Sequence, residues 1–301
     1  PLFRLSPMMV KKVINVVSVS WYSSGHIKRM VNNLLDKAEN PETLTFTIID
    51  NTNGTDMELK EVLSDVPSLT ILYNKSEAKQ RSVAHASALD VAMSKLETYF
   101  TLVVDPDVHI FKEGWDSFCQ SKIESGQSAV GAPYPKWKLG KVHDFPSVVF
   151  IFSSTEWFTR EGKSWHPFPP FWRRAWNFFV RKFVRLFRFA TRQRLENSRL
   201  MRTVTSGLET MTGITSPDTG WRLVKAAKER GDVSIVFEAP YSSGLPDPMV
   251  ELARNFELFF YSSEPFMSHM YSSGISYYRT EKSGDLNAWI SAVEQVERSL
   301  N

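Results

Sequence analysis

Two aspartates, one residue apart, follow an apolar, strand-like run of the chain. Asp105 and Asp107 flank Pro106 in the stretch YFTLVVDPDVHIF, which runs from Tyr99 to Phe111. Neighbouring carboxylates repel each other, and withdrawal from water at the end of a buried strand adds to this cost. A divalent cation between them would remove the repulsion, because Mg²⁺ and Mn²⁺ prefer oxygen ligands and commonly bind carboxylates together with substrate phosphates. The pattern predicts a metal and phosphate site, with a simple Asp-Pro-Asp turn as an equally good alternative.

Three other kinds of phosphate-binding site have more specific sequence motifs. A dinucleotide site needs G-x-G-x-x-G after the first strand, but residues 20–26 read SWYSSGH, with one glycine. The phosphate-cradling pattern G-x-x-x-x-G-K-[ST] is absent from the sequence. A phosphatase with an aspartate nucleophile usually carries it on the first strand and follows it with small residues, whereas Asp105 follows the fourth apolar run. These comparisons leave two interpretations of the aspartate pair, metal-assisted binding of a phosphate-bearing substrate and a simple turn.

The elements that must position the two aspartates alternate between strand and helix. We expect strands at 13–20, 44–50, 69–74, 99–105 and 128–134, with helices at 26–39, 56–65, 77–97 and 114–125 between them. Strands separated by helices of this length predict right-handed βαβ units and a mostly parallel sheet. Ligands of such sheets bind beyond the carboxyl ends of the strands. Further strands are expected at 144–155 and 233–241, and a helix at 218–231.

Composition indicates an ordinary globular protein, since 42% of the 301 residues are hydrophobic and 23% are charged. The single cysteine, Cys119, excludes an intrachain disulfide and a thiolate zinc cluster. No apolar stretch approaches the roughly 20 residues that span a bilayer. The single cysteine favours a reducing compartment, and we expect a cytoplasmic protein that is peripheral on the inner face of the membrane. We also expect one continuous α/β domain, with a nucleotide-binding half at 1–135 and an acceptor-side half at 136–301.

Four segments between residues 13 and 111 resemble, in order and spacing, the family-2 glycosyltransferases of the GT-A fold. They read VVSVSWYSSGHIKRMVNNLL, FTIIDNTNGTD, NKSEAKQRSVAHASALDVA and FTLVVDPDVHI. The later segments SPDTGWRL (216–223) and FMSHMYSSG (266–274) are similar to the family's acidic motif and to its late histidine loop. The resemblance implies a GT-A fold with a mostly parallel sheet, a nucleotide-diphosphate sugar as donor, and a divalent cation, Mn²⁺ or Mg²⁺.

The resemblance also assigns roles to individual residues. It implies that Asp218 is the catalytic base, that Asp105 and Asp107 hold metal and sugar nucleotide, and that His269 completes the metal shell. The positions expected to contact the nucleotide sugar follow the ends of the strands, and they are Ser20, Trp21, Asp50, Asn51, Lys79, Arg81 and Asp105.

Plainer interpretations stand beside several of these roles. Asp218 could be a helix cap that stabilises the helix dipole, a role compatible with catalysis. A lone histidine such as His269 is more often structural than a ligand, and we take His85 and His109 to be structural. Lys79 could lie on a solvated helix face instead of contacting phosphate as a point charge.

A strongly basic segment lies between Trp172 and Arg202. It holds ten Lys and Arg residues against one acid, Glu196, although the whole chain carries a net charge of only +3. A helical wheel of this segment predicts an apolar side and an opposite arginine side. The apolar side holds Trp172, Trp176, Phe179, Phe183, Phe187 and Ala190, and the basic side holds Arg174, Arg181, Arg185, Arg188 and Arg192. Such a helix is typical of an interfacial membrane anchor. Packing on the core is one alternative, and nucleic-acid binding is another.

These observations together predict an inverting, metal-dependent glycosyltransferase. We expect a UDP-sugar as donor, a lipid-linked saccharide or other glycan as acceptor, and an anionic inner membrane surface as the partner of residues 172–202. Two rival hypotheses are a non-catalytic scaffold of the same fold that binds membrane or nucleic acid, and a nucleotidyltransferase. A scaffold would have no reason to keep Asp105, Asp107 and Asp218 together.

Overall fold

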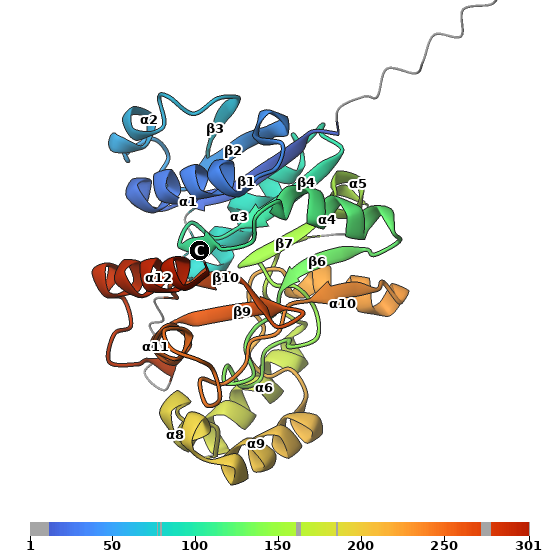
Figure 1. The fold of residues 1–301 in the computed structure, drawn as a ribbon. Coiled ribbons are helices and arrows are strands. Elements are labelled where there is room, and N and C mark those ends of the chain that lie inside the picture. Colours follow the sequence, from blue (N-terminus) through green and yellow to red (C-terminus); the bar gives the residue numbers. More distant parts are fainter. Residues whose placement is uncertain are drawn as a thin grey trace, which may run out of the picture.

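A seven-stranded sheet forms the centre of the molecule (Figure 1). The structure is a computed structural model, and it describes residues 12–76, 78, 80–160, 164–184, 186–271 and 278–300. Across the sheet the strands follow the order β3 (Leu69–Tyr73), β2 (Leu44–Asp50), β1 (Ile14–Ser20), β4 (Phe100–Val104), β7 (Phe150–Ser154), β6 (Ala129–Ala132) and β8 (Ser234–Val236). Strand β7 pairs antiparallel with both of its neighbours, and every other pairing in this sheet is parallel. The expected α/β fold with a mostly parallel sheet is therefore confirmed.

The pairing register places the carboxyl ends of the first strands at one edge of the sheet. Ser20 pairs with Asp50, and Asp50 pairs with Tyr73, so β1, β2 and β3 end at the same level. Strand β4 pairs with β1 and leads directly into Asp105. The polar segments that follow the strands thus meet at this edge, as expected of a parallel sheet.

Helices cover both faces of the sheet. Successive side chains of β1 point to opposite faces, so each face has its own apolar cluster. Ile14 and Val16 pack in one cluster with side chains of α1 (Ser24–Lys37), α2 (Glu58–Val62) and α4 (Trp115–Glu124). Val17 and Val19 pack on the other face. Their cluster includes side chains of α3 (Arg81–Met93), α5 (Thr155–Thr159) and α10 (Trp221–Arg230). A short 3₁₀ turn, η1 (Pro41–Thr43), leads into β2.

A second sheet carries the late histidine to the edge of the first. Its three antiparallel strands are β5 (Val108–Ile110), β10 (Glu264–His269) and β9 (Glu257–Tyr261). His269 is the register partner of Val108 on one side and of Glu257 on the other. Helices α11 (Met249–Asn255) and α12 (Leu286–Leu300) contribute to a separate apolar cluster with this sheet. Because β5 begins immediately after Asp107, this pairing brings His269 beside the aspartate pair.

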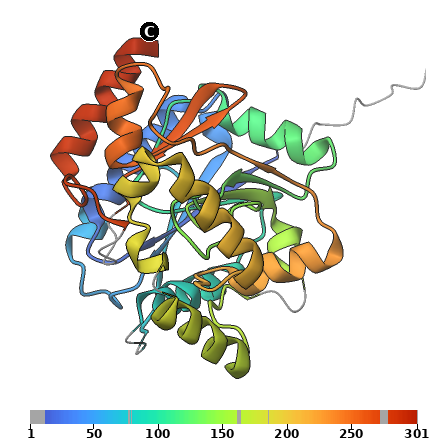
Figure 2. The same cartoon turned by 90° about the horizontal axis from the view of Figure 1, so that it is seen from below.

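The basic segment forms several helices at the lower end of the molecule in Figure 1, seen from below in Figure 2. They are α6 (Phe171–Phe183), α7 (Leu186–Phe189), α8 (Arg192–Asn197) and α9 (Arg199–Thr212). The expected continuous amphipathic helix is therefore wrong. The Thr191 hydroxyl accepts from the Arg194 N–H and the Ser198 hydroxyl accepts from the Met201 N–H, so each caps the start of a new helix. Among the residues described, no helix is long and apolar enough to cross a bilayer.

Among the arginines that the helical wheel placed on the basic side, Arg192 departs most from the prediction. Its side chain is buried and donates hydrogen bonds to the backbone carbonyls of Ala253 and Phe256. The guanidinium also lies 4.6 Å from the ring centroid of Trp137. Arg192 therefore belongs to the interior, since the helix break turns it inward. Ala190 is buried as well, while Arg185 and the side chain of Phe187 lie outside the described residues.

Candidate active site

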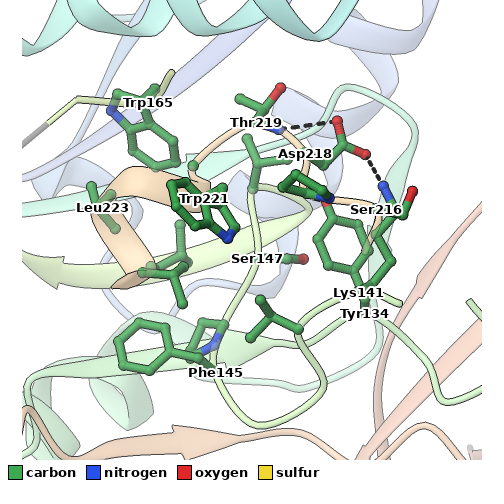
Figure 3. Close-up of a pocket in the computed structure, with 17 residues that line it drawn as sticks. Tyr134, Lys141, Phe145, Ser147, Trp165, Ser216, Asp218, Thr219, Trp221 and Leu223 are labelled. Atoms are coloured by element: carbon green, nitrogen blue, oxygen red, sulfur yellow. Dashed lines mark hydrogen bonds and ion pairs between the residues drawn. The ribbon is translucent and has the colours of Figure 1, made fainter. Parts of the chain in front are cut away.

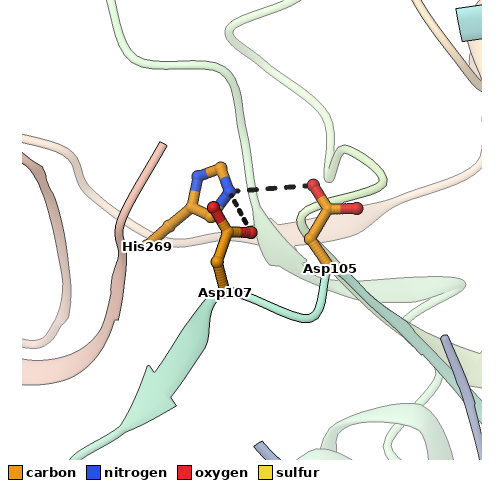
Figure 4. Close-up of side chains that lie close together, drawn as sticks. All are labelled: Asp105, Asp107 and His269. Carbon is orange, nitrogen blue, oxygen red and sulfur yellow. Dashed lines mark hydrogen bonds and ion pairs between the residues drawn. The ribbon is translucent and has the colours of Figure 1, made fainter. Parts of the chain in front are cut away.

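Asp105, Asp107 and His269 form a three-residue cluster at the carboxyl edge of the sheet (Figure 4). The His269 Nε2 atom lies 3.1 Å from Oδ1 of Asp107 and 3.8 Å from Oδ2 of Asp105. One ligand atom from each of the three side chains lies within 4.8 Å of the other two. Two carboxylates and one imidazole are a donor set that can hold a divalent cation. The three residues assigned to the metal are thus brought together.

Electrostatics explain how the two carboxylates coexist. Burial would lower the pKa of His269, but Asp107 and Glu257 raise it to about 10, so the ring is an imidazolium without a metal ion. Burial, with the repulsion of Asp107, raises the pKa of Asp105. Burial also opposes ionisation of Asp107, yet the charge and hydrogen bond of His269 hold the pKa of Asp107 below its usual range. The imidazolium supplies the positive charge that the sequence pattern requires.

Behind His269 lies a buried ion pair. The Nδ1 atom of His269 is 2.8 Å from Oε2 of Glu257, and the other carboxylate oxygen of Glu257 lies 2.5 Å from Nζ of Lys138. Both Glu257 and Lys138 are almost fully buried. Burial disfavours the charged form of Glu257, but Lys138 and His269 lower its pKa to about 2.

The cluster opens into a cleft of about 810 Å³. This volume is in the range of small-molecule sites, which is about 300–1,000 Å³. Asn51 and Arg81 line the cleft, and so does Trp21, whose ring is 58% exposed. Asp218 lines it from the side of the second half of the chain. The predicted residues found in or on this cleft are Trp21, Asn51, Arg81, Asp105, Asp107, Asp218 and His269.

Of the other three residues predicted to contact the nucleotide sugar, two do not line this cleft and one lies outside the described residues. The carboxylate of Asp50 accepts hydrogen bonds from the backbone N–H groups of Thr52 and Gly54, so it organises the loop after β2. It lines a separate hollow and not the large cleft, which leaves the neighbouring Asn51 as the residue of that loop that reaches the cleft. Ser20 is fully buried and its hydroxyl bonds that of Ser23. Lys79 lies outside the described residues.

Asp218 precedes α10 and forms an ion pair with Lys141 (Figure 3). The Lys141 ammonium lies 2.5 Å from one carboxylate oxygen, and the Thr219 N–H donates to the other at 3.0 Å. Burial would raise the pKa of Asp218, but Lys141 and the Thr219 N–H hold it below its usual range. The Thr219 hydroxyl donates to the carbonyl of Ser82, which fastens the start of α10 to α3.

Sequence reasoning missed several charged groups in or next to the cleft. Lys138, Lys141 and Glu257 lie 31 or more residues from the aspartate pair, and no motif marks them. His85, taken to be structural, lines the cleft with Nε2 3.9 Å from Asp105, and burial lowers its pKa to about 4. The available signal was its place as the fifth residue of α3, within the segment that resembles a phosphate-binding connection. His109, in contrast, pairs with Glu297 of α12 at 2.8 Å.

Comparison with known proteins gives similarity at the level of structure alone. No protein-family profile matches the chain, and no curated protein sequence matches it. The structure is similar to that of the mannosyltransferase PcManGT from Pyrobaculum calidifontis in complex with GDP-Man and Mn²⁺, with a TM-score of 0.41 and 12% identity over 72% of this chain and 79% of that one.

Two further similar structures are of residues 1–349 of TarS from S. aureus. The first has a TM-score of 0.39 and 15% identity over 51% of this chain and 50% of TarS 1–349. The second, in complex with UDP-GlcNAc, has a TM-score of 0.38 and 13% identity over 51% and 48%. This chain therefore spans about half the length of that TarS fragment.

Proposed function

We propose that this protein is a metal-dependent glycosyltransferase of the GT-A type that uses a nucleotide-diphosphate sugar. One observation supports the proposal above the others: two aspartates and a histidine converge in a cleft that is also lined by a fourth residue, which bears a third, separate carboxylate. The first three suit a cation bound to a diphosphate. The fourth, Asp218, suits proton removal from an acceptor.

The residues of the cluster fit a divalent cation of the Mn²⁺ or Mg²⁺ type, because two of the three donors are carboxylates. When bound, such an ion would neutralise charge that develops on the leaving diphosphate. Asp105, Asp107 and the Nε2 atom of His269 would hold it. Arg81, exposed at the start of α3 and lining the same cleft, is placed to donate hydrogen bonds to a phosphate oxygen.

The donor's nucleoside would lie along the ends of β1 and β2. Asn51 and Trp21 line this part of the cleft, and they offer an amide and an aromatic face to a base. The side-chain oxygen Oδ1 of Asn51 already accepts from the side-chain amide of Asn74 at 2.7 Å, which fixes the orientation of the Asn51 amide. A UDP-sugar is the donor that we propose.

Asp218 would act as the general base in an inverting transfer. Its carboxylate is one-third exposed, at 33%, so an acceptor hydroxyl can approach it. The ion pair with Lys141 keeps the carboxylate ionised at neutral pH, as a base must be before it takes a proton. A base on the acceptor side, separate from the metal ligands, is the arrangement that a single displacement needs.

We further propose that the acceptor is lipid-linked and that the basic helices bind an anionic membrane. Along α6 an aromatic stripe is exposed, with side-chain exposures of 45–81%: Trp172, Trp176, Phe179 and Phe183. Leu200, Val204 and Met211 give α9 an exposed apolar stripe of its own. Arg174, Arg181 and Lys182 are exposed beside these rings. Rings at the headgroup boundary and cations among lipid phosphates are the pattern of an interfacial helix.

The position of α6 favours a membrane acceptor over a membrane scaffold. The Arg173 guanidinium donates to the carbonyl of Ile214 at 3.2 Å, four residues before Asp218. The lipid-binding helix and the segment with the base are thus directly bonded. A lipid-linked saccharide held at the surface would be near the acceptor side of the cleft.

The deciding experiment is a panel of nucleotide sugars tested for thermal stabilisation with and without Mn²⁺. A ligand that binds only the folded state raises the melting temperature, by an amount set by its concentration relative to its dissociation constant. We expect one donor to stabilise the parent only with Mn²⁺, and Asp107→Asn to lose this effect. Equal stabilisation of Asp107→Asn would reduce the aspartate pair to a turn. Stabilisation by a nucleoside triphosphate and by no nucleotide sugar would favour a nucleotidyltransferase.

A further inference from the structure

The buried carboxylate of Glu257 makes two contacts that bear on the three candidate metal ligands Asp105, Asp107 and His269, which we call the metal cluster. One oxygen lies 2.8 Å from Nδ1 of His269 and the other lies 2.5 Å from Nζ of Lys138. Glu257 itself is 0% exposed. Burial of a carboxylate away from water costs free energy unless the group is paired and hydrogen-bonded, so the buried position of Glu257 needs an explanation.

The backbone fixes the contact between Glu257 and His269. The two residues are register partners in the antiparallel pair β9 and β10. On the other side of β10, His269 pairs with Val108, and the Met270 N–H donates to the carbonyl of Asp107 at 2.9 Å. Glu257, His269 and Val108 therefore lie in one row across the sheet, and Asp107 immediately precedes Val108, so strand pairing brings Asp107 beside His269.

This row determines which nitrogen of His269 is left for a metal ion. A carboxylate only accepts hydrogen bonds, so the proton on the Glu257 side is carried by Nδ1. The Nε2 atom then faces Asp107 and Asp105, and it is the atom that can bind a metal once it gives up its own proton. Histidine ligands commonly donate their other N–H to a carboxylate, which fixes the ring and increases its basicity.

Lys138 restrains the second oxygen of Glu257. Its ammonium lies over the Tyr271 ring, 3.3 Å from the centroid, and its side chain is 1% exposed. An oxygen held in this ion pair is not available to rotate towards the cluster and bind the metal itself. The Lys138 ammonium also balances the charge of Glu257, which is a third carboxylate next to the two of Asp105 and Asp107.

We propose that Glu257 is the positioning residue of the metal site and that Lys138 holds it in place. Glu257 acts through His269: it selects the tautomer and orientation that present Nε2 to the ion. The inference rests on the proposed function, because it assumes that the cluster binds a divalent cation.

The test measures Mn²⁺ affinity from the electron paramagnetic resonance signal of free Mn²⁺, without any turnover assay. We expect Glu257→Gln to weaken Mn²⁺ binding by about 10- to 100-fold. The matched control is Glu264→Gln, which removes an exposed glutamate from β10, where it pairs with Lys112. It should bind Mn²⁺ like the parent.

A double-mutant cycle separates positioning from mere stability. If Glu257 acts through His269, Glu257→Gln should cost no further affinity in a His269→Ala background. If Glu257→Gln does not fold beside the unpaired ammonium, Lys138→Met with Glu257→Gln replaces it in every comparison. Mn²⁺ affinity within about twofold of the parent, or an equal loss with and without His269, would overturn the inference. A parent that binds no Mn²⁺ would instead overturn the metal site of the proposed function.

Discussion

Lys141 and Asp218 form an ion pair of 2.5 Å, and Asp218 lines the same cleft as the metal cluster. The lysine comes from the loop after β6 and the aspartate from the segment before α10 (Figure 3). The loop of Lys141 is fastened to that segment, because the carbonyl of Gly140 accepts from the N–H groups of Thr215 and Ser216. The pair is thus held by backbone contacts on both sides, and it sets the protonation of the proposed base.

Replacing Lys141 should change the pH at which Asp218 takes up a proton. The ammonium holds the pKa of Asp218 below its usual range, so Lys141→Met should raise this pKa. The carboxylate would then be protonated at a higher pH, and the acidic limb of kcat/KM would move to higher pH. Carboxyl ¹³C NMR with Asp218→Asn for assignment measures the pKa directly. Lys225→Met, which removes an exposed lysine paired with Glu229, is the control, and an unchanged Asp218 pKa in Lys141→Met would contradict the prediction.

Mn²⁺ binding should release more than one proton near pH 7, one from His269 and part of one from Asp105, because burial raises the pKa of Asp105 to about 7. The pKa of His269 is raised to about 10 without metal, so its ring is charged at neutral pH and must lose a proton before it can bind an ion. Affinity should therefore rise with pH, by at least about a factor of ten per unit, and more steeply below pH 7, where Asp105 is also protonated. Calorimetry in two buffers of different ionisation enthalpy counts the protons. Affinity that stays constant between pH 6.5 and about 8.5 would show that His269 is not a ligand.

Asp218→Asn should lower turnover by about 10²- to 10⁴-fold while folding hardly changes. The amide is similar in size and keeps an oxygen that accepts from the Thr219 N–H. Mn²⁺-dependent donor binding should stay at the parent's level, because the metal cluster is separate. Transfer from the stabilising donor, assayed on membrane extracts as acceptor, is the measurement. Parent-like turnover would leave Asp218 with a structural role only, in its contacts with Lys141 and the Thr219 N–H.

Substitution of three exposed cations of α6 should weaken binding to anionic vesicles. Each basic residue near an anionic surface contributes on the order of 1 kcal/mol, so Arg174→Gln, Arg181→Gln and Lys182→Gln together should cost about 100-fold in affinity. Raised salt should act in the same direction. The control removes three exposed lysines elsewhere, at 60, 225 and 228. Co-sedimentation with phosphatidylglycerol and phosphatidylcholine vesicles is the readout.

Three results of that assay would contradict the lipid proposal. They are equal binding to both vesicle types, insensitivity to salt, and an equal effect of the control. Preference for RNA or DNA over anionic vesicles would move the basic helices to a nucleic-acid partner. A mass in solution that rises with protein concentration would show self-association. If this association uses the aromatic stripe, the stripe binds a second copy of the chain and not a membrane.

The sequence allowed prediction of those parts of the site that lie on regular strands. A run such as LTFTIID has a strong strand pattern, and it was placed to the residue, at Leu44–Asp50. Parallel order then brought the segments after β1, β2 and β4 to one edge, so Asp105, Asp107 and Asn51 were found together. The same reasoning placed Asp50 in the cleft. It could not show that the loop at 50–54 uses that carboxylate for its own N–H groups.

The rest of the site depends on contacts between distant segments. Glu257 meets Lys138 across 119 positions, and its only local mark is a charged residue at the start of an apolar strand. The helical wheel failed because it assumed one uninterrupted helix. Thr191 and Ser198 are residue types that cap helix starts, and they mark the breaks that turned Arg192 inward.

The buried guanidinium of Arg192 ties the basic helices to the part of the molecule that carries the candidate active site. It is bonded to the carbonyls of Ala253 and Phe256, immediately before Glu257, which contacts the metal cluster through His269. Excision of residues 171–212 would leave those carbonyls buried and unpaired beside the cluster. The segment is thus no detachable module. Any protein engineer who exchanges it to redirect acceptor choice would have to keep this one arginine and its stacking partner Trp137.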